Sequence, residues 1–333
     1  MSRSATIEVV TRIGPDEMAA ALRDDARRGL TDRRKHLPSR WFYDERGSEL
    51  FSAITRLPEY YPTRREREIL RARAATIARR SGADTLVELG SGTSGKTRLL
   101  LDAFTATGRL QRFVALDVSD ECLRDTARTL CDEYPGLGVV AVVADFERHL
   151  DAIPDGGRRC VAFLGSTIGN LDPAGRARFY ADLADELRPG DSFLLGTDLR
   201  KDPRRLVAAY DDAEGVTAEF NRNVLHVLNR ELGADFEPDR FEHVARWDDV
   251  RSWMAMSLRS TVAQTVTVAA LDLMVDFAEG EELHTEISAK FDRPMVEPEL
   301  ATAGFSLGNW WTDTAGDFAL SLWFRDERAA PAT

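Results

Sequence analysis

The sequence predicts an α/β fold, with a Rossmann-like, mostly parallel sheet of seven strands that ends in an antiparallel hairpin and an inserted α+β domain. Three observations carry this prediction. Apolar runs alternate with helix-like segments from Asp84 to residue 198, the rhythm breaks from 199 to about 290, and two strand-like runs close the chain. Strands that alternate with helices at this spacing form parallel βαβ units with right-handed crossovers.

Composition and charge favour a small-molecule enzyme over other classes of protein. Of the 333 residues, 43% are hydrophobic, and the formal net charge is −12. An acidic surface repels phosphate backbones and anionic membranes, so we expect neither a nucleic-acid nor a membrane partner. The three cysteines show no C-x-x-C spacing and the start lacks a signal-peptide core, which favours the cytoplasm. The histidines show no metal-binding spacing, so we expect no metal.

Five apolar runs are expected to form the parallel part of the sheet. They are short, they end in glycine or polar residues, and most are followed by a helix-like segment. We place these strands at residues 84–90, 112–118, 138–145, 160–166 and 191–198. Upstream, residues 16–38 are typical of a helix with a basic connector, whereas the first fifteen residues show little pattern. The residues alone do not fix the oligomeric state, and a monomer is our working expectation.

Two hairpins are expected beyond residue 199. The alternating runs TVAQTVTVAALDLMVDF and EELHTEISAKF are separated by AEGE, which is typical of an antiparallel hairpin inside the insertion. The runs LGNWWTD and DFALSLWFR flank a TAG turn and predict the closing pair of the large sheet.

The glycine-rich segment VELGSGTSGKT after the first strand has two interpretations. The run ELGSG at residues 88–92 resembles motif I of class I methyltransferases, where an acid and a glycine turn let the backbone approach the methionine part of the cofactor. However, Gly90, Gly95, Lys96 and Thr97 also satisfy the Walker A spacing G-x-x-x-x-G-K-T, which predicts a nucleotide hydrolase with Mg²⁺ on Thr97.

Three further features favour the methyltransferase interpretation. Glu88 would place a carboxylate beside a triphosphate, where like charge is costly. Asp117 ends the second strand at about the distance of a ribose-binding acid, and the pair Asp145-Phe146 ends the third strand. An aspartate at one strand end is commonly only a helix cap, but acids at successive strand ends of one sheet indicate a ligand crevice.

Longer blocks carry a resemblance to a family. The segments LPSRWFYDERGSELFSAITRLPEYYPTR, VELGSGTSGKTR, FLGSTIGNL, GTDLRKD, AYDDAEGVTAEFNRNVL and TEISAKF resemble the histidine-specific methyltransferases, from about Ala19 to Arg325. The resemblance implies that S-adenosylmethionine is the cofactor and that L-histidine is trimethylated on its α-amino group to hercynine, which begins ergothioneine biosynthesis. A class I methyltransferase of another amino acid or small amine is the alternative.

The resemblance also implies a set of site residues. The implied cofactor contacts are Tyr43, Gly90, Lys96, Asp117, Asp145 and Phe146. The implied histidine contacts are Tyr60, Gly165, Asn170, Tyr210, Met256, Glu286 and Ser288. It further implies an N-terminal segment (1–60) that joins the substrate domain, a cofactor domain (61–198), a substrate-binding insertion (199–286) and a C-terminal completion of the sheet (287–333).

The chemistry of these residues fits the implied roles, although some of them are also typical of purely structural positions. The Tyr43 hydroxyl can accept or orient a proton of the substrate amine, which makes it the expected catalytic residue, although Trp41, Phe42 and Tyr43 are also typical core aromatics. Glu286 and Ser288 alternate along one face of a strand and match the two imidazole nitrogens. Without the family, Glu286 is equally typical of a solvated strand.

Asn170 and two tyrosines complete the expected substrate site. Asn170, Tyr60 and Tyr210 offer neutral hydrogen bonds to the α-carboxylate or the α-amine. Met256, which we place on a helix, is expected to form a wall of the pocket.

Overall fold

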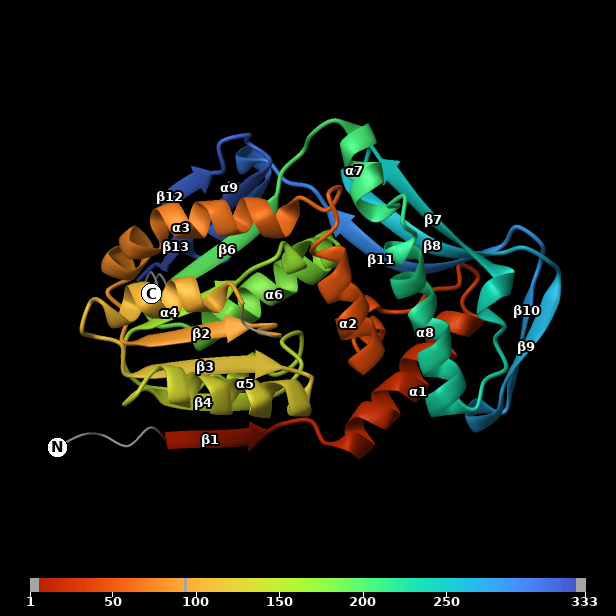
Figure 1. Ribbon diagram of the computed structural model, residues 1–333, viewed down its shortest axis with the longest axis horizontal. Helices are drawn as coiled ribbons and strands as arrows, with labels where there is room; N and C mark the ends of the chain where they lie inside the picture. Colours follow the sequence, from red (N-terminus) through yellow and green to blue (C-terminus); the bar gives the residue numbers. More distant parts are fainter. Residues whose placement is uncertain (1–5, 93–94, 328–333) are drawn as a thin grey trace, which may run out of the picture. The chain divides into compact units, whose positions relative to one another are not determined.

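The chain forms two compact units in a computed structural model that describes residues 6–92 and 95–327. The first, the sheet unit, combines the chain up to Ile13 with Pro62–Leu199 and the chain from Phe291 onward. The second, the insertion unit, combines Gly14–Tyr61 with Arg200–Lys290. Figure 1 shows the elements of both units along the chain.

The sheet unit is built on an eight-stranded sheet with the order β1-β4-β3-β2-β5-β6-β13-β12. Its strands are β1 (Thr6–Thr11), β2 (Thr85–Leu89), β3 (Arg112–Asp117), β4 (Gly138–Val143), β5 (Arg159–Phe163), β6 (Ser192–Asp198), β12 (Phe305–Thr312) and β13 (Phe318–Arg325). The first six are parallel, and β13 and β12 complete the sheet as an antiparallel pair. The expected fold class and closing hairpin are therefore confirmed.

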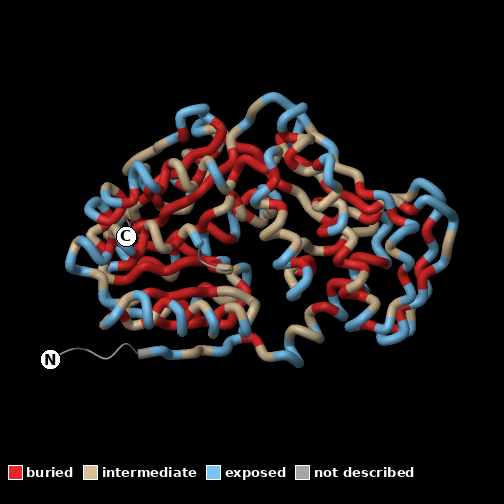
Figure 2. Tube along the Cα trace, in the orientation of Figure 1, coloured by how far each residue is buried: buried red, intermediate tan, exposed pale blue. Residues whose placement is uncertain are grey.

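The sheet has one strand more than the seven that the sequence predicts. The additional strand, β1, pairs in parallel with β4 at the edge of the sheet. Figure 2 shows β1 as partly exposed, and Ile7 keeps 44% of its surface accessible, whereas β2 and β5 are buried throughout. This strand forms because it pairs with β4. Since it is an exposed edge strand, the first fifteen residues show no strong hydrophobic pattern that would have predicted it.

Helices connect the strands of the sheet unit. They are α3 (Pro62–Ser81), α4 (Thr97–Thr105), α5 (Asp120–Glu133), α6 (Pro173–Glu186) and α9 (Arg293–Thr302), with short 3-10 turns η2 (Leu150–Ala152) and η3 (Thr167–Asn170). Asp172 caps α6 by accepting a hydrogen bond from the Gly175 amide, and proline occupies the first helical position.

The insertion unit packs helices against small antiparallel sheets. Its helices are α1 (Pro15–Thr31), α2 (Glu45–Ile54), α7 (Pro203–Tyr210) and α8 (Val216–Leu232), with 3-10 turns η1 (Ser39–Phe42), η4 (Pro238–Arg240) and η5 (Ala269–Leu271). Its strands are β7 (Phe241–Asp248), β8 (Trp253–Ser260), β9 (Gln264–Val268), β10 (Leu273–Phe277) and β11 (Glu282–Ala289). One sheet has the order β11-β8-β7 and the other joins β9 to β10. A hydrophobic core that includes Phe42, Phe220 and Phe241 unites these elements.

Two expectations about the insertion are wrong in detail. The run 261–277 does not pair with 281–291, because it folds on itself: β9 and β10 form a hairpin around η5, and Asp272 adopts a left-handed conformation with φ 47°. β11 pairs with β8 instead and extends to Ala289, beyond the expected boundary at residue 286. The N-terminal boundary differs too, since residues up to Ile13 lie with the sheet unit.

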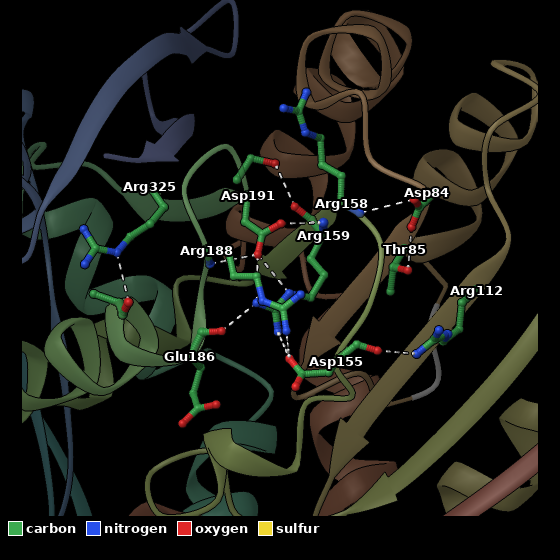
Figure 3. Close-up of polar contacts among 12 residues, drawn as sticks. Asp84, Thr85, Arg112, Asp155, Arg158, Arg159, Glu186, Arg188, Asp191 and Arg325 are labelled. Atoms are coloured by element: carbon green, nitrogen blue, oxygen red, sulfur yellow. Dashed lines mark hydrogen bonds and ion pairs between the residues drawn. The ribbon is translucent and has the colours of Figure 1, made fainter. Parts of the chain in front are cut away.

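A buried ion pair joins the amino ends of β5 and β6 (Figure 3). The Arg159 guanidinium donates to Asp191 Oδ2 at 2.9 Å and to the Glu186 carbonyl at 2.6 Å, and its side chain is 1% exposed. Asp191 Oδ1 also accepts from the Arg159 amide at 2.8 Å, and the Arg325 amide donates to the Asp191 carbonyl. The ion pair and its hydrogen bonds therefore hold the starts of β5 and β6 together, at the end of the sheet opposite the carboxyl ends of the strands.

We predict that Asp191→Asn lowers the free energy of unfolding by about 3–5 kcal/mol, because it leaves the buried Arg159 cation with only the exposed Asp155, 3.9 Å away, as a counter-charge. Urea unfolding followed by circular dichroism measures the change. Asp125→Asn is the matched control: it breaks an ion pair with Arg128 whose side chains are 67% and 69% exposed, so stability should hardly change. Equal stability of the two variants would show that the buried pair is not stabilising.

Candidate active site

The carboxyl ends of the parallel strands bring most of the expected cofactor contacts to one edge of the sheet. Gly90 follows β2, Asp117 ends β3, and Asp145 and Phe146 follow β4, while Lys96 precedes α4. The chain crosses from one side of β2 to the other when it leaves β4 and enters β5, which makes this edge a topological switch point. Ligands of open α/β sheets bind at such points.

The turn after β2 leaves room for a ligand. Gly90 has φ +66° and Gly92 has φ +45°, and a Cβ added to either would meet no atom of the described residues within 4 Å. The Gly90 amide donates to the Leu116 carbonyl at 2.8 Å, which fixes the turn against β3. The neighbouring Thr93 and Ser94 lie outside the described residues.

Asp117 acts on the loop as well as facing the ligand edge. Its Oδ2 accepts from the Gly92 amide at 3.0 Å and its Oδ1 from the Ser119 amide at 3.1 Å. Burial raises the pKa of the Asp117 carboxyl, while these amides oppose the shift. The N-cap of α5 is Ser119, which has no side-chain cap, so Asp117 fixes the loop rather than capping the helix; the residue as a whole is partly buried.

The Walker A interpretation does not fit the contacts. The Thr97 hydroxyl, which would bind Mg²⁺, donates to the buried Glu88 carboxylate, and the Lys96 ammonium, which would bind phosphate, pairs with Glu66. Burial raises the pKa of Glu88 to about 7. The nearby Glu66 and Asp117 carboxylates also raise this pKa, whereas the Lys96 charge lowers it. Such a cluster of acids repels a triphosphate.

Sequence reasoning missed Glu66, on α3. Its side chain is fully buried, and it accepts hydrogen bonds from the Lys96 ammonium and, at 2.8 Å, from the Gly165 amide. A Cβ on Gly196 of β6 would overlap the Glu66 carboxylate, so the glycine makes room for it. One signal was available, because Glu66 lies on the apolar stripe of α3 with Ile69 and Leu70, where an unpaired acid is rare.

Two expected histidine contacts belong to the loop after β5. Gly165 has φ +75°, and Ser166 is also left-handed with φ 61°, which turns the chain sharply out of the strand. The Ser166 hydroxyl accepts from the Asp198 amide at 2.9 Å and so fixes this loop to β6. Asn170 ends η3 and remains partly exposed.

The other five expected histidine contacts lie in the insertion unit. The Tyr60 and Tyr210 rings lie 6.5 Å apart, and the Tyr210 hydroxyl is 2.8 Å from Ser288 Oγ. Glu286 on β11 stands opposite Met256 on β8. Met256 is therefore on a strand rather than the expected helix, and every second side chain of that strand from Met254 to Ser260 is buried.

Tyr43 follows η1 in the insertion unit, apart in sequence from the other expected cofactor contacts. Its ring packs edge-on against Phe51 at 5.6 Å and Phe220 at 5.4 Å, and it stays partly exposed at the border of the core. Trp41 and Phe42 are buried, so the core interpretation is correct for these two aromatics. Tyr43 is therefore packed against the core without being buried in it.

Within residues 6–92 and 95–327, no group of three or more His, Cys, Asp or Glu residues is arranged to hold a metal ion. In the same ranges, no helix has both the length and the apolar character needed to cross a membrane.

Comparisons with known proteins agree with this architecture. A family model described as "Histidine-specific methyltransferase, SAM-dependent" matches residues 22–325. The chain is 59% identical to a histidine N-alpha-methyltransferase of Mycolicibacterium smegmatis, over 95% of this chain and 99% of that protein. It is 58% identical to a histidine N-alpha-methyltransferase of Mycobacterium tuberculosis, over 95% and 98%. Ergothioneine biosynthesis protein 1 of Schizosaccharomyces pombe is 33% identical over 65% of this chain and 30% of its own length.

We predict that Glu88 makes the ligand-free protein less stable as pH rises. The folded state holds the Glu88 proton up to about pH 7, whereas the unfolded state releases it near 4.5. The stability from this proton is therefore fully present below pH 4.5 and lost as pH rises to about 7. Glu88→Gln is neutral and still accepts from Thr97. Relative to this variant, the wild type should lose about 3 kcal/mol between pH 4.5 and 7.5, at about 1.4 kcal/mol per pKa unit.

Urea unfolding of both proteins at a series of pH values measures this difference. Stability curves that stay parallel from pH 4.5 to 7.5 would mean that Glu88 titrates normally in the folded protein.

Proposed function

Because the chain belongs to the S-adenosylmethionine-dependent histidine-specific methyltransferases, we propose that it trimethylates the α-amino group of L-histidine to hercynine, the first step of ergothioneine biosynthesis. The near-full-length identity to two histidine N-alpha-methyltransferases carries this proposal. S-adenosylmethionine supplies an electrophilic methyl group on a sulfonium. The protein has to position a neutral amine in line with that methyl group and keep water away.

The sheet unit is proposed to hold the cofactor. The open turn at Gly90 gives the methionine part close access to the backbone, and the Lys96 ammonium suits its carboxylate. Asp117 is proposed to accept from the ribose hydroxyls, while Asp145 and Phe146 face the adenine. Phe146 packs against Phe163 at 5.0 Å between ring centroids, which orients its ring at this edge.

The insertion unit is proposed to recognise most of the histidine. Glu286 accepts from one imidazole nitrogen and Ser288 donates to the other, while Tyr60 and Tyr210 bind the α end of the substrate and Met256 forms the wall. From the sheet unit, Asn170 and the Gly165 backbone are proposed to bind the α-carboxylate or the α-amine. Imidazole offers one donor and one acceptor when neutral, so a carboxylate and a hydroxyl match it.

Tyr43 is the proposed catalytic residue. The amine attacks only as the free base, so the monomethyl- and dimethylammonium formed by the first and second transfers must each lose a proton before the next transfer. The Tyr43 hydroxyl orients or accepts this proton, and its ring tolerates the growing ammonium through cation–π attraction. A trimethylated nitrogen has no lone pair, so the series ends there.

We further propose that the protein works in the cytoplasm as a monomer. The cysteines Cys122, Cys131 and Cys160 are free thiols, which agrees with a reducing compartment. The oligomeric state stays a prediction.

The proposal is tested by incubating the protein with methyl-labelled S-adenosylmethionine and each of the twenty amino acids. We expect label on histidine alone, with mass spectrometry showing one, two and finally three methyl groups on the α-nitrogen. Preferred labelling of another amino acid would replace histidine as the substrate. In parallel, the protein is titrated with ATP and Mg²⁺. Binding of ATP in this titration would support the nucleotide-hydrolase alternative.

We predict that Glu286→Ala raises the KM for histidine at least tenfold, equivalent to about 1.4 kcal/mol or more, because the imidazole loses a charge-assisted hydrogen bond. The affinity for S-adenosylmethionine should change little, since most of its expected contacts belong to the sheet unit. Steady-state kinetics with histidine varied at saturating cofactor, beside a cofactor titration, measures both.

Glu242→Ala provides the matched control, because Glu242 is a carboxylate of the same unit whose side chain is 59% exposed. Its kinetics should equal those of the wild type. If Glu286→Ala also left the histidine KM unchanged, Glu286 would not contact the ring.

A further inference from the structure

A buried lysine stands behind two of the proposed histidine contacts. Lys290 follows directly after β11, and its surface is 0% exposed. Its ammonium lies 2.8 Å from the Tyr210 hydroxyl and 2.8 Å from Ser288 Oγ. It also lies over the Tyr210 ring, 4.6 Å from the centroid. We call these three residues the Lys290 triad.

The ammonium fixes the direction of hydrogen bonding in the triad. A lysine ammonium only donates, so the oxygens of both Tyr210 and Ser288 accept from it. These two oxygens are 2.8 Å apart, and one hydroxyl donates to the other. The triad thereby uses one of its two hydroxyl protons internally and directs the second to an acceptor beyond the three residues.

The triad is held rigidly on both sides. His243 Nε2 lies 2.8 Å from the Tyr210 carbonyl, and its Nδ1 lies 2.9 Å from Asn221 Nδ2. Asn221 Nδ2 donates, so His243 is neutral, with its proton on Nε2. Burial lowers the pKa of His243, which favours the same form. The other side is β11, whose ladder with β8 includes Ser288 and Ala289.

The Lys290 ammonium is buried beside two hydroxyls that accept from it. Removing an ammonium from water costs several kcal/mol even after relaxation, and an apolar side chain of similar length would fill the same space without that cost. Side chains at 286, 288 and 290 share one face of an extended chain. Along that face the order is carboxylate, hydroxyl, ammonium, which is complementary to a ligand with a proton donor at one end and an anion at the other.

We propose that Lys290 is a positioning residue that selects amino acids with a free α-carboxylate. It acts by orienting the Tyr210 and Ser288 hydroxyls, whose one outward proton goes to the imidazole nitrogen beside Ser288, and by adding positive potential on the side of the α-carboxylate. Glu286 binds the imidazole, and Lys290 favours the α-carboxylate at the opposite end of the substrate. Histamine-like or amide-capped substrates, which lack this carboxylate, are therefore rejected. This inference rests on the proposed function, because it assumes that histidine is the substrate.

The experiment compares L-histidine with L-histidinamide, which has the same ring and α-amine but no anionic group. kcat/KM is measured for both at saturating S-adenosylmethionine, in the wild type, Lys290→Met and Lys290→Gln. We expect the wild type to prefer histidine at least tenfold, and both variants to reduce that preference to threefold or less, mainly through a higher KM for histidine. The different acidity of the amide's amine cancels, because the preference is compared between proteins.

Lys201→Met is the matched control. The Lys201 ammonium is likewise 2.8 Å from a tyrosine hydroxyl, that of Tyr61, and lies 4.4 Å from the centroid of its ring. This variant should keep the wild-type preference.

The outcomes separate three cases. Equal losses on both substrates, with the preference intact, would make Lys290 purely structural and overturn the proposal. A wild-type preference below threefold, once each kcat/KM is divided by the fraction of neutral α-amine at the assay pH, overturns it without any variant and so remains decisive if both variants fail to fold. A wild type that methylates neither compound, yet labels another amino acid, refutes the proposed function instead.

Discussion

The ligand edge of the sheet unit depends on one buried carboxylate, that of Glu66. A desolvated carboxylate destabilises a fold unless it is paired, and here the partners are the Lys96 ammonium and the Gly165 amide. These partners follow different strands, β2 and β5, and Gly196 of β6 leaves the space. The carboxylate is therefore satisfied only when α3 and all three strands are in place, which ties a proposed cofactor contact to a proposed substrate contact.

Several carboxylates lie close together at the same edge, which explains why the Walker A spacing predicts the wrong ligand. The carboxylates of Glu66 and Asp117 act on the buried Glu88 against the single charge of Lys96, and together with burial they keep the Glu88 proton bound to about pH 7. An excess of acid disfavours a polyphosphate but favours a sulfonium cofactor. The spacing G-x-x-x-x-G-K-T specifies a turn and a lysine, whereas the identity of the ligand follows from what the lysine and the threonine contact.

The sequence predicted those strands whose hydrophobic pattern is visible in the local sequence. The five parallel strands and the closing hairpin have strong apolar runs and glycine boundaries, so their ends were placed to within three residues. Strand partners were harder: β1 is defined by β4, and β11 by β8 rather than by its neighbour in sequence. Glu66 and Lys290 escaped for a related reason, because a charged residue looks solvated until tertiary contacts show that it is buried.

The two units divide the chemistry according to what their backbones offer. Parallel strands end in turns whose amides and acids suit a cofactor that does not vary. An antiparallel strand such as β11 presents alternate side chains on one face, so the residues proposed to distinguish one amino acid from another occupy alternate positions of a short segment. In the proposed site, a change at Glu286 would alter which side chain is recognised without disturbing the sheet proposed to hold the methyl donor. Lys290 behind Ser288 would hold constant the recognition of the α-carboxylate that all amino acids share, so that specificity for the ring could vary independently of the α end.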